Sequence, residues 1–242
     1  MLVSIGLMLV ASCVPPAPAP APPSAAAQAE PRHPVIIVHG FQIFCGSESA
    51  DVWQVWFDEA QRRGYRADEI TMFDYDTCQP SVNVGAALAN RIDEVLAATG
   101  APKVDLIAHS MGSIISRSCI RSGGCAGKVG RFASIAGANH GTLWANFCPL
   151  AFWSPSCGDM LPEGPYLAGL NATDETWGDT GYRTMVSWCD LTIVPFTSTA
   201  LDGALNVVTD RCVSHTEWRS DQIGATWVFD WFTGPAPSVL PG

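Results

Sequence analysis

Short apolar runs alternate along the chain with longer segments in which apolar residues recur at helical spacing. The short runs predict strands at residues 35–38, 69–75, 104–108, 131–136, 182–188 and 204–208. The longer segments predict helices at residues 51–63, 84–98, 113–121 and 223–232. Runs rich in β-branched residues, such as Val35-Ile36-Ile37-Val38, are typical of strands that are buried on both faces of a parallel sheet.

This alternation of strands and helices predicts the fold class. Strands that are separated by helices pair in parallel, and the crossovers between them are right-handed. We therefore expect an α/β fold in which helices flank both faces of a mostly parallel central sheet. Residues 139–179 show no clear periodicity and are rich in Gly, Pro and Trp, so we expect a long loop there, packed over one end of the sheet.

The N-terminal residues differ in character from the rest of the chain. Residues 2–11 form an apolar run that has the length of a signal-peptide core and is too short to span a bilayer. The following Val-Ala-Ser-Cys13 resembles the lipobox of bacterial lipoproteins, although no Lys or Arg precedes the apolar run. The alternative is an ordinary signal peptide in which Cys13 has no special role. Residues 14–33 are rich in Pro and Ala, which predicts an extended tether.

We therefore divide the chain into a signal and lipobox segment (residues 1–13), a tether (14–33) and a folded domain (34–242). This division predicts export. Cys13 is the candidate lipidation site that would anchor the protein at the outer face of the cell membrane; without lipidation the protein would be secreted.

Charge and cysteine content narrow the classes of function. The chain has 23 Asp and Glu against 13 Lys and Arg, and the resulting net charge of −10 repels phosphate backbones, so we expect no nucleic-acid partner. Apart from Cys13, an even set of cysteines in an exported domain indicates disulfides: Cys45, Cys78, Cys119, Cys125, Cys148, Cys157, Cys189 and Cys212. None of them has zinc-ligand spacing, so we expect no metal site of that kind.

The strongest local signal for chemistry lies around Ser110. The apolar strand that ends at Ala108 runs directly into His109-Ser110-Met111-Gly112, and a predicted helix follows. This strand–turn–helix context is that of a nucleophile elbow, in which a tight turn between small residues exposes a serine hydroxyl at the carboxyl end of a sheet. The simpler alternative is a chance Ser-x-Gly, and the preceding buried strand argues against it.

A nucleophilic serine needs a general base, which in this fold follows it in the chain. His33 and His39 precede Ser110, and we expect the side chain of the adjoining His109 to point elsewhere. His215 lies in a polar loop after the last predicted strand, where the base is expected. His140 comes too early in the chain, and we expect it to line the cleft or to pack locally.

The orienting acid is expected one strand before the base. Asp190 follows the predicted strand at residues 182–188, so a carboxylate there can hold the imidazole of His215. The competing carboxylates are interpreted as turn residues or solvated loop charges: Asp174, Asp179, Asp202 and Asp210. Asp174, Glu175 and Asp179 could also bind Ca²⁺, but a solvated acidic loop is the simpler interpretation.

Two backbone N–H groups are candidates for an oxyanion hole. One belongs to Met111, directly after the candidate nucleophile. The other belongs to Phe41, because His39-Gly40-Phe41 follows the first predicted strand and Gly40 permits a sharp turn there. The alternative for this His-Gly pair is an ordinary turn that ends a strand.

In this set of motifs the chain resembles the small secreted bacterial lipases of the α/β-hydrolase superfamily, particularly the actinobacterial class with several cysteines. Six segments carry the resemblance, and His215 follows them at the expected distance. In chain order the segments are Val38 to Phe41, Val104 to Gly112, His140 to Ala145, Leu170 to Thr176, Cys189 to Pro195 and Leu201 to Val207. The resemblance implies a minimal α/β-hydrolase fold, with Ser110, Asp190 and His215 as the catalytic triad. One departure is Ser113, where a second Gly is expected.

The resemblance predicts a monomeric serine carboxylic-ester hydrolase that needs no cofactor and acts through an acyl-enzyme on Ser110. Acylglycerols are the expected lipid substrates, which makes a triacylglycerol lipase the first hypothesis. The alternatives are a short-chain esterase, a cutinase-like polyesterase, or a non-catalytic surface lipoprotein on a hydrolase scaffold. Acyl-chain length depends on the shape of the pocket, which the sequence does not reveal.

Cysteine positions predict one disulfide beside the candidate site. Cys189 adjoins Asp190 and Cys212 lies three residues before His215, so both are expected at the same end of neighbouring strands, close enough to bond. The short spacings suggest two local bridges, Cys119 to Cys125 and Cys148 to Cys157, which leaves Cys45 and Cys78 to pair. Other pairings and free thiols remain alternatives.

Overall fold

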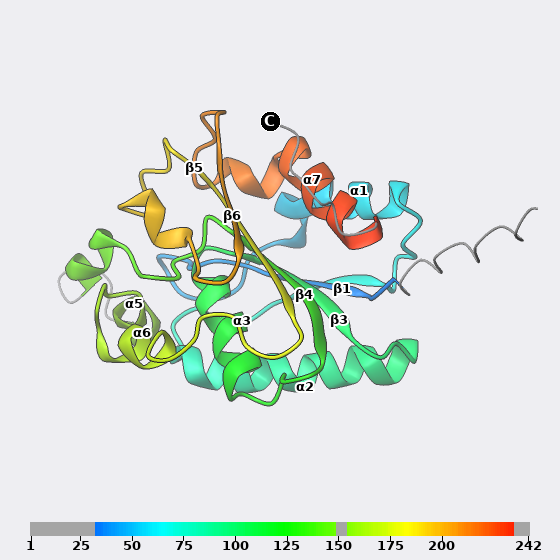
Figure 1. Cartoon of the computed structure of the whole chain (residues 1–242), viewed down its shortest axis with the longest axis horizontal. Helices are drawn as coiled ribbons and strands as arrows, with labels where there is room; N and C mark the ends of the chain where they lie inside the picture. Colours follow the sequence, from blue (N-terminus) through cyan, green and yellow to red (C-terminus); the bar gives the residue numbers. More distant parts are fainter. Residues whose placement is uncertain (1–31, 149–153, 235–242) are drawn as a thin grey trace, which may run out of the picture. The chain divides into compact units, whose positions relative to one another are not determined.

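The computed structural model describes residues 32–148 and 154–234. The signal and lipobox segment with Cys13, and almost all of the expected tether, lie outside the described residues. Six parallel strands form one sheet in the order β2-β1-β3-β4-β5-β6, which confirms the expected fold class (Figure 1). The strands are β1 Val35–Val38, β2 Ile70–Phe73, β3 Val104–His109, β4 Val129–Ile135, β5 Gly181–Ser187 and β6 Leu205–Thr209.

Helices cover both faces of this sheet. On one face, α2 (Ser81–Thr99) and α3 (Met111–Arg121) pack against a core that includes Ile36 and Leu106. On the other face, α1 (Gln54–Arg62) and α7 (Gln222–Thr233) pack together (Figure 1). Alternate residues of the buried strands therefore point into two separate apolar layers, which explains why the strands are continuous apolar runs.

The order of the strands fixes where a site can form. The chain passes from β1 to β2 on one side, and then returns to place β3 on the opposite side of β1. In an open parallel sheet, a crevice forms outside the carboxyl ends of the strands at the point where the order reverses. The loops that follow β1 and β3 meet at this point, and they carry Phe41 and Ser110.

The segment between β4 and β5 differs from the expected long loop. Its described residues, 136–148 and 154–180, include a 3₁₀ helix at Leu143–Phe147 and the short α-helices α5 (Pro155–Asp159) and α6 (Pro165–Leu170). Both α-helices start with Pro, which is favourable in the first turn because its missing N–H has no partner there. Each completes less than two turns, so no periodic pattern reveals it in the sequence; packing of α5 on α2 and of α6 on α3 stabilises them.

Eight cysteines of the described chain form four disulfides. The pairs are Cys45–Cys78, Cys119–Cys125, Cys148–Cys157 and Cys189–Cys212, which are the pairs that the sequence favours. Cys45, Cys78 and Asp76 lie close enough together to suggest a metal site, but both sulfurs are already used in the disulfide. In the part of the chain that the structure describes, no helix combines the length and the apolar character needed to cross a bilayer.

Candidate active site

Ser110 lies in a strained turn between β3 and α3. Its φ of 55° and ψ of −126° are unfavourable for a residue with a side chain, and such strain persists only where the surrounding structure enforces it. Small neighbours allow the turn to form. A Cβ on Gly112 would collide with the backbone of β1, and a Cβ on Gly40 would lie 2.8 Å from the Ser110 Cβ. These contacts are those of a nucleophile elbow.

Ser110, His215 and Asp190 form one continuous row of hydrogen bonds. Ser110 Oγ lies 2.9 Å from His215 Nε2, and His215 Nδ1 lies 2.8 Å from Asp190 Oδ2. All three residues are buried. Because the carboxylate accepts the proton on Nδ1, Nε2 is left with the lone pair that can accept the Ser110 proton. The structure thus brings together three residues that are up to 105 positions apart in sequence.

The Asp190 carboxylate is fixed by its own loop. Its Oδ1 accepts the backbone N–H groups of Thr192, at 2.8 Å, and Ile193, at 2.9 Å, so Oδ2 remains directed at His215. The Cys189–Cys212 disulfide joins this loop, after β5, to the loop after β6 that carries His215. The acid and the base are therefore held both by hydrogen bonds and by a covalent link.

The turn with the candidate oxyanion donor Phe41 is held by His39 and Tyr75. The Tyr75 hydroxyl donates to the His39 carbonyl at 2.6 Å, and the His39 ring stacks on Tyr75 with centroids 4.2 Å apart. His39 Nδ1 donates to the Gly40 carbonyl at 2.9 Å. The other candidate donor, Met111, is the first residue of α3, where backbone N–H groups have no partner within the helix. Phe41 and Ser110 line one pocket.

His109 has a role in this site that the sequence does not reveal. Its Nε2 donates to the His215 carbonyl at 2.9 Å, and the two rings lie 4.6 Å apart. The ring therefore points away from the Ser110 hydroxyl, as expected, but it supports the backbone of the candidate base. Burial, reinforced by the nearby His215, lowers the pKa of His109 well below its usual value, so the ring is neutral near pH 7.

A pocket of about 490 Å³ opens onto Ser110 and His215. Phe41, Ile43 and Phe44 are the apolar residues that line it. Glu48 and Arg219 also line the pocket, and they neutralise each other in an ion pair of 2.6 Å between Oε1 and Nη1. This composition suits a substrate with a hydrocarbon part and no large net charge.

The remaining acidic and histidine candidates do not converge on Ser110. His140 pairs with Glu175, with 2.7 Å between Nε2 and Oε1, and it does not line the pocket. Asp179 pairs with Lys103, and Asp174 accepts the N–H of Thr176. Because these acidic groups are each used separately, they do not form a common set of calcium ligands.

Ser113, the departure from the expected Gly, is accommodated by hydrogen bonds. Its hydroxyl donates to the Ala108 carbonyl at 3.2 Å and accepts the Ser134 hydroxyl at 2.9 Å. The close approach of α3 to β4 that a Gly would permit is thus achieved with a small polar side chain.

The fold and the arrangement of Ser110, His215 and Asp190 define an α/β-hydrolase with the geometry of a serine triad. The family model described as "Lipase (class 2)" matches residues 32–224. The chain therefore belongs to the class 2 lipase family.

Curated relatives agree with this membership over part of the chain. A triacylglycerol lipase of Burkholderia plantarii is 34% identical over 98 residues, which are 39% of this chain and 26% of that protein. A triacylglycerol lipase of Pseudarthrobacter phenanthrenivorans is 34% identical over 97 residues, or 38% of this chain and 30% of that protein. The match thus spans less than a third of either relative.

Solved structures agree on the fold. The mature form of the Bacillus licheniformis lipase BlEst2 superposes with a TM-score of 0.70 at 17% identity, covering 87% of this chain and 96% of that chain. Aspergillus fumigatus lipase B gives a TM-score of 0.66 at 14% identity, with 88% of this chain and 57% of that chain covered.

Proposed function

We propose that this protein is a carboxylic-ester hydrolase with Ser110 as its nucleophile. The hydrogen-bonded row from Ser110 Oγ through His215 to Asp190 carries the proposal, because it contains a nucleophile, a base and an orienting acid in reach of one another. Membership of the lipase family supports it independently.

The reaction proceeds in two steps through an acyl-enzyme. His215 takes the Ser110 proton as the oxygen attacks the ester carbonyl, and Asp190 stabilises the imidazolium that forms. The N–H groups of Phe41 and Met111 donate to the oxyanion, and His215 then protonates the departing alcohol. Water, activated by His215, attacks the acyl group and releases the acid and the free Ser110.

Acylglycerols are the proposed substrates. The apolar residues that line the pocket and its neutralised ion pair favour an uncharged ester with a hydrocarbon chain. The two curated relatives are named triacylglycerol lipases, which supports the same class. No step in this mechanism needs a cofactor.

The decisive experiment combines chemical labelling with a substrate series. A fluorophosphonate should modify Ser110 alone, as peptide mass spectrometry would show. Initial rates on p-nitrophenyl esters with acyl chains of two to sixteen carbons, beside an emulsified triglyceride, then define the specificity. Activity on long chains and on the emulsion supports a lipase. Activity restricted to short chains or to polyesters supports the esterase and cutinase alternatives, and no labelling or turnover supports a non-catalytic lipoprotein.

We also propose that the protein is exported, either secreted or anchored through lipidated Cys13. The four disulfides support export, because disulfides persist in oxidising compartments. Mass spectrometry of protein from a bacterial host would detect a diacylglyceryl group on Cys13, and Cys13→Ala should release the protein from the membrane fraction. Recovery of wild-type protein in the cytosol with residues 1–13 intact would contradict export.

A further inference from the structure

One side of the pocket is lined by polar side chains that the proposed reaction does not use. They are Gln42, Glu48, Thr216 and Arg219. In that reaction His215 protonates the departing alcohol, so the alcohol part of the ester lies next to His215 and the residues beside it. Thr216 adjoins His215, and Arg219 belongs to the 3₁₀ helix that follows, Glu217–Ser220. The alcohol part of the substrate therefore meets this polar side of the pocket.

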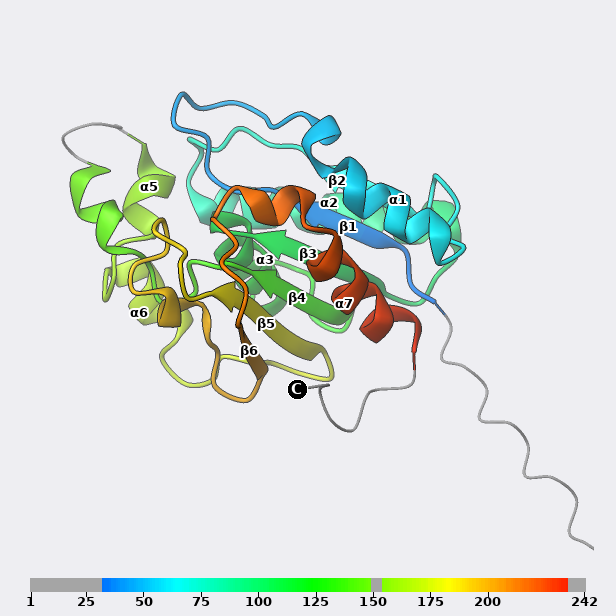
Figure 2. The ribbon, with the colours of Figure 1, turned by 90° about the horizontal axis from the view of Figure 1, so that it is seen from above.

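Glu48 organises the polar side. Its side chain is only 5% exposed. Glu48 Oε1 accepts both Gln42 Nε2, at 2.8 Å, and Arg219 Nη1, at 2.6 Å, while Oε2 accepts Trp53 Nε1 at 2.6 Å. One oxygen atom thus holds the ends of the Gln42 and Arg219 side chains next to each other. Figure 2 shows the loop after β1, which carries Gln42 and Glu48, beside the segment that precedes α7, which carries Arg219.

Three polar groups on this side are left free for a ligand. Gln42 gives Nε2 to Glu48, so its Oε1 remains an acceptor, with no hydrogen-bond partner within residues 32–148 and 154–234. Arg219 gives Nη1 to Glu48 and Nε to the Thr216 carbonyl, so Nη2 remains a donor. The Thr216 hydroxyl also has no partner in the described chain. Because an alcohol O–H both donates and accepts, this combination of groups matches an alcohol that carries further hydroxyls.

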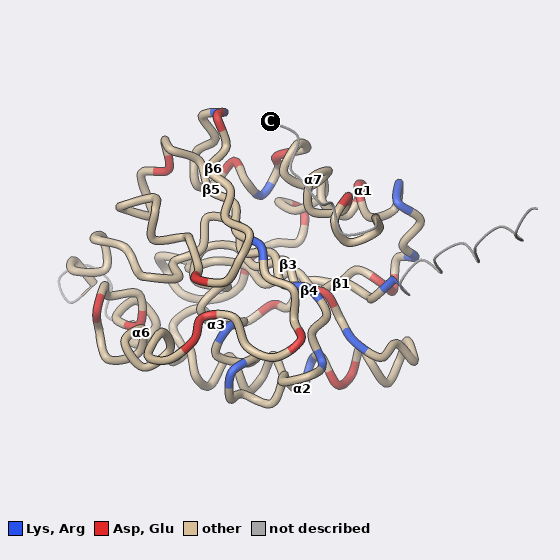
Figure 3. The backbone as a smooth tube through the Cα atoms, viewed as in Figure 1, with Lys and Arg blue, Asp and Glu red and all other residues tan. Residues whose placement is uncertain are grey.

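The charges on the polar side cancel. Arg219 is the one Lys or Arg among the described residues that line the pocket, and its guanidinium is paired with Glu48. The loop at residues 40–49 contains no Lys or Arg, and Figure 3 shows that these residues lie mainly on other parts of the described chain. Phosphates and carboxylates are bound best by unpaired cationic groups. The free donors and acceptors therefore suit an uncharged ligand.

We propose that Gln42, Thr216 and Arg219 bind the hydroxyl groups of the leaving alcohol, so that the preferred substrates are esters of polyols, such as monoacylglycerols. This inference rests on the proposed ester hydrolysis and adds the alcohol part of the substrate. Glu48 acts as a positioning residue, because its oxygens are used by the protein and it orients two of the binding groups. A site that hydrogen-bonds a substrate hydroxyl discriminates against the analogue that lacks it.

Three dissolved butyrate esters test this subsite: ethyl butyrate, 2-hydroxyethyl butyrate and 1-monobutyryl glycerol. All three form the same butyryl enzyme on Ser110, so differences in kcat/KM report on the alcohol. Each value is divided by the rate of hydroxide-catalysed hydrolysis of the same ester, which removes differences in chemical reactivity. Wild-type kcat/KM should then rise about threefold to tenfold with each added hydroxyl, the effect of one hydrogen bond at a site that water can reach.

Variants locate the effect through one ratio, that of kcat/KM for 1-monobutyryl glycerol to kcat/KM for ethyl butyrate. Gln42→Met removes the acceptor and leaves Glu48 bonded to Arg219 and Trp53. Thr216→Val removes the hydroxyl at nearly constant shape. Each should lower the ratio about fivefold. The ratio is independent of the concentration of folded protein, so partial unfolding of a variant does not imitate the effect.

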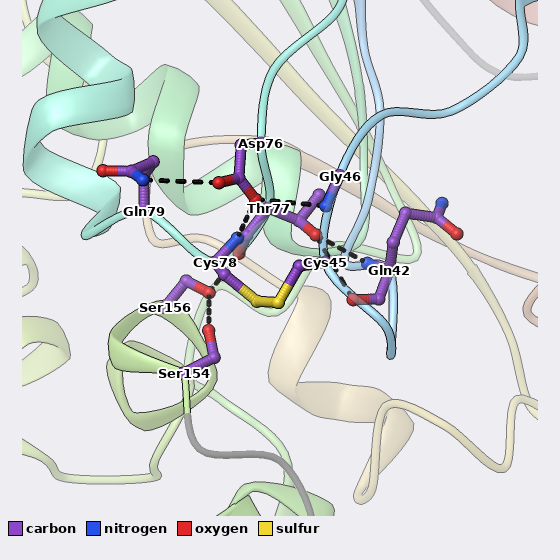
Figure 4. The surroundings of a disulfide bond; sticks show 9 residues. All are labelled: Gln42, Cys45, Gly46, Asp76, Thr77, Cys78, Gln79, Ser154 and Ser156. Carbon is purple, nitrogen blue, oxygen red and sulfur yellow. Dashed lines mark hydrogen bonds between the residues drawn. A yellow bond between two sulfur atoms is a disulfide. The ribbon is translucent and has the colours of Figure 1, made fainter.

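Gln79→Met is the matched control. Gln79 also donates Nε2 to a carboxylate, that of Asp76 at 3.3 Å, but it does not line the pocket. In Figure 4, Gln79 and Gln42 lie on opposite sides of Asp76. The Gln79→Met protein should have the wild-type ratio.

Equal normalised kcat/KM values for the three esters in the wild type would overturn the subsite. So would a wild-type ratio in both the Gln42→Met and the Thr216→Val proteins. In either case, turnover of ethyl butyrate leaves the proposed ester hydrolysis standing. A wild-type protein that hydrolyses none of the three esters refutes the proposed function instead.

Discussion

Two of the histidine–carboxylate pairs in the described chain, His215–Asp190 and His140–Glu175, have similar bonds, but only the first lies within hydrogen-bond distance of Ser110. His215 and Asp190 are separated by 2.8 Å, and His140 and Glu175 by 2.7 Å, so the bonds themselves are alike. Their surroundings differ. The free ring nitrogen of His215 faces the Ser110 hydroxyl, whereas Nδ1 of His140 lies 3.3 Å from the Ser198 carbonyl.

Burial separates the two pairs further. The His140 side chain is 41% exposed, whereas that of His215 is 10% exposed and Asp190 is fully enclosed. Water reaches the His140 side of the second pair and screens its charge, whereas the Glu175 side chain is only 13% exposed. The comparison teaches that a histidine and a carboxylate in contact do not make an active site. A nucleophile on the second nitrogen, and exclusion of water, are also needed.

The largest expected effect comes from removing Ser110, the proposed nucleophile, which only the His215–Asp190 pair contacts. Ser110→Ala should lower kcat/KM on p-nitrophenyl butyrate by at least about 10,000-fold, since nucleophile and base act as a unit. Circular dichroism and urea unfolding should show an intact fold. If the purified variant retains more than a few percent of the wild-type rate, Ser110 is not the nucleophile.

Replacing each of the two histidines with alanine tests the comparison directly. His215→Ala should reduce activity about as much as Ser110→Ala, because the serine then lacks its base. His140→Ala should retain most of the turnover, because its ring contacts neither Ser110 nor the pocket. Both proteins are assayed under identical conditions on the same ester. The opposite ranking would assign the base to His140.

Replacing each carboxylate with the corresponding amide should give a somewhat smaller difference in kcat between the two pairs. Asp190→Asn should reduce kcat by up to about 10,000-fold, because the amide favours the wrong tautomer of His215. Glu175→Gln should leave kcat nearly unchanged and lower the free energy of unfolding by about 1 kcal/mol, because Glu175 also accepts the Asp202 N–H. Steady-state kinetics and urea titrations measure the two effects. A large loss of kcat in the Glu175 variant would contradict the assignment.

A disulfide, Cys189–Cys212, joins the loops that carry Asp190 and His215, and removing that bond measures its contribution. Cys189→Ser/Cys212→Ser should lower the free energy of unfolding by about 3 kcal/mol, from the entropy of the loop that the bond closes. Lower activity at a temperature where the variant is fully folded would show that the bond also positions Asp190 and His215. Unchanged activity there would limit its role to stability.

The smallest expected effect concerns His109, which supports His215 and has no counterpart beside His140. Its pKa is lowered in the folded protein by burial, so the unfolded chain binds a proton first as the pH falls. Stability should therefore decline below about pH 6.5, with a slope from this group of up to about 1.4 kcal/mol per pH unit.

His109→Gln removes this titration and keeps a side-chain donor for the His215 carbonyl. Urea unfolding at pH 7 and pH 5 should show a smaller loss of stability in this variant than in the wild type. Equal losses would mean that His109 is not held neutral in the folded state.

The sequence alone predicted the parts of the fold that are encoded locally. Continuous β-branched runs and helical periodicity located all six strands and the four long helices to within a few residues. The Ser110 turn was visible because a buried strand, small residues and a helix must follow one another there. In this fold the acid and the base follow the serine in the chain, each on a loop after a strand. That order indicated Asp190 and His215, at the carboxyl edge of the sheet.

What the sequence could not show depends on contacts between distant segments. Helices α5 and α6 are too short to carry a periodic pattern, so only their packing on α2 and α3 stabilises them. Likewise, no local signal links His109 to the His215 carbonyl, or Glu175 to His140.

By itself, the sequence determined a parallel α/β domain with a serine elbow, because strand, turn and helix are set by neighbours in the chain. The tertiary structure decided which carboxylate meets which histidine and which apolar residues stay in water. Those outcomes depend on loops that are joined only when the sheet assembles, as with Trp144 and Leu191, 47 residues apart.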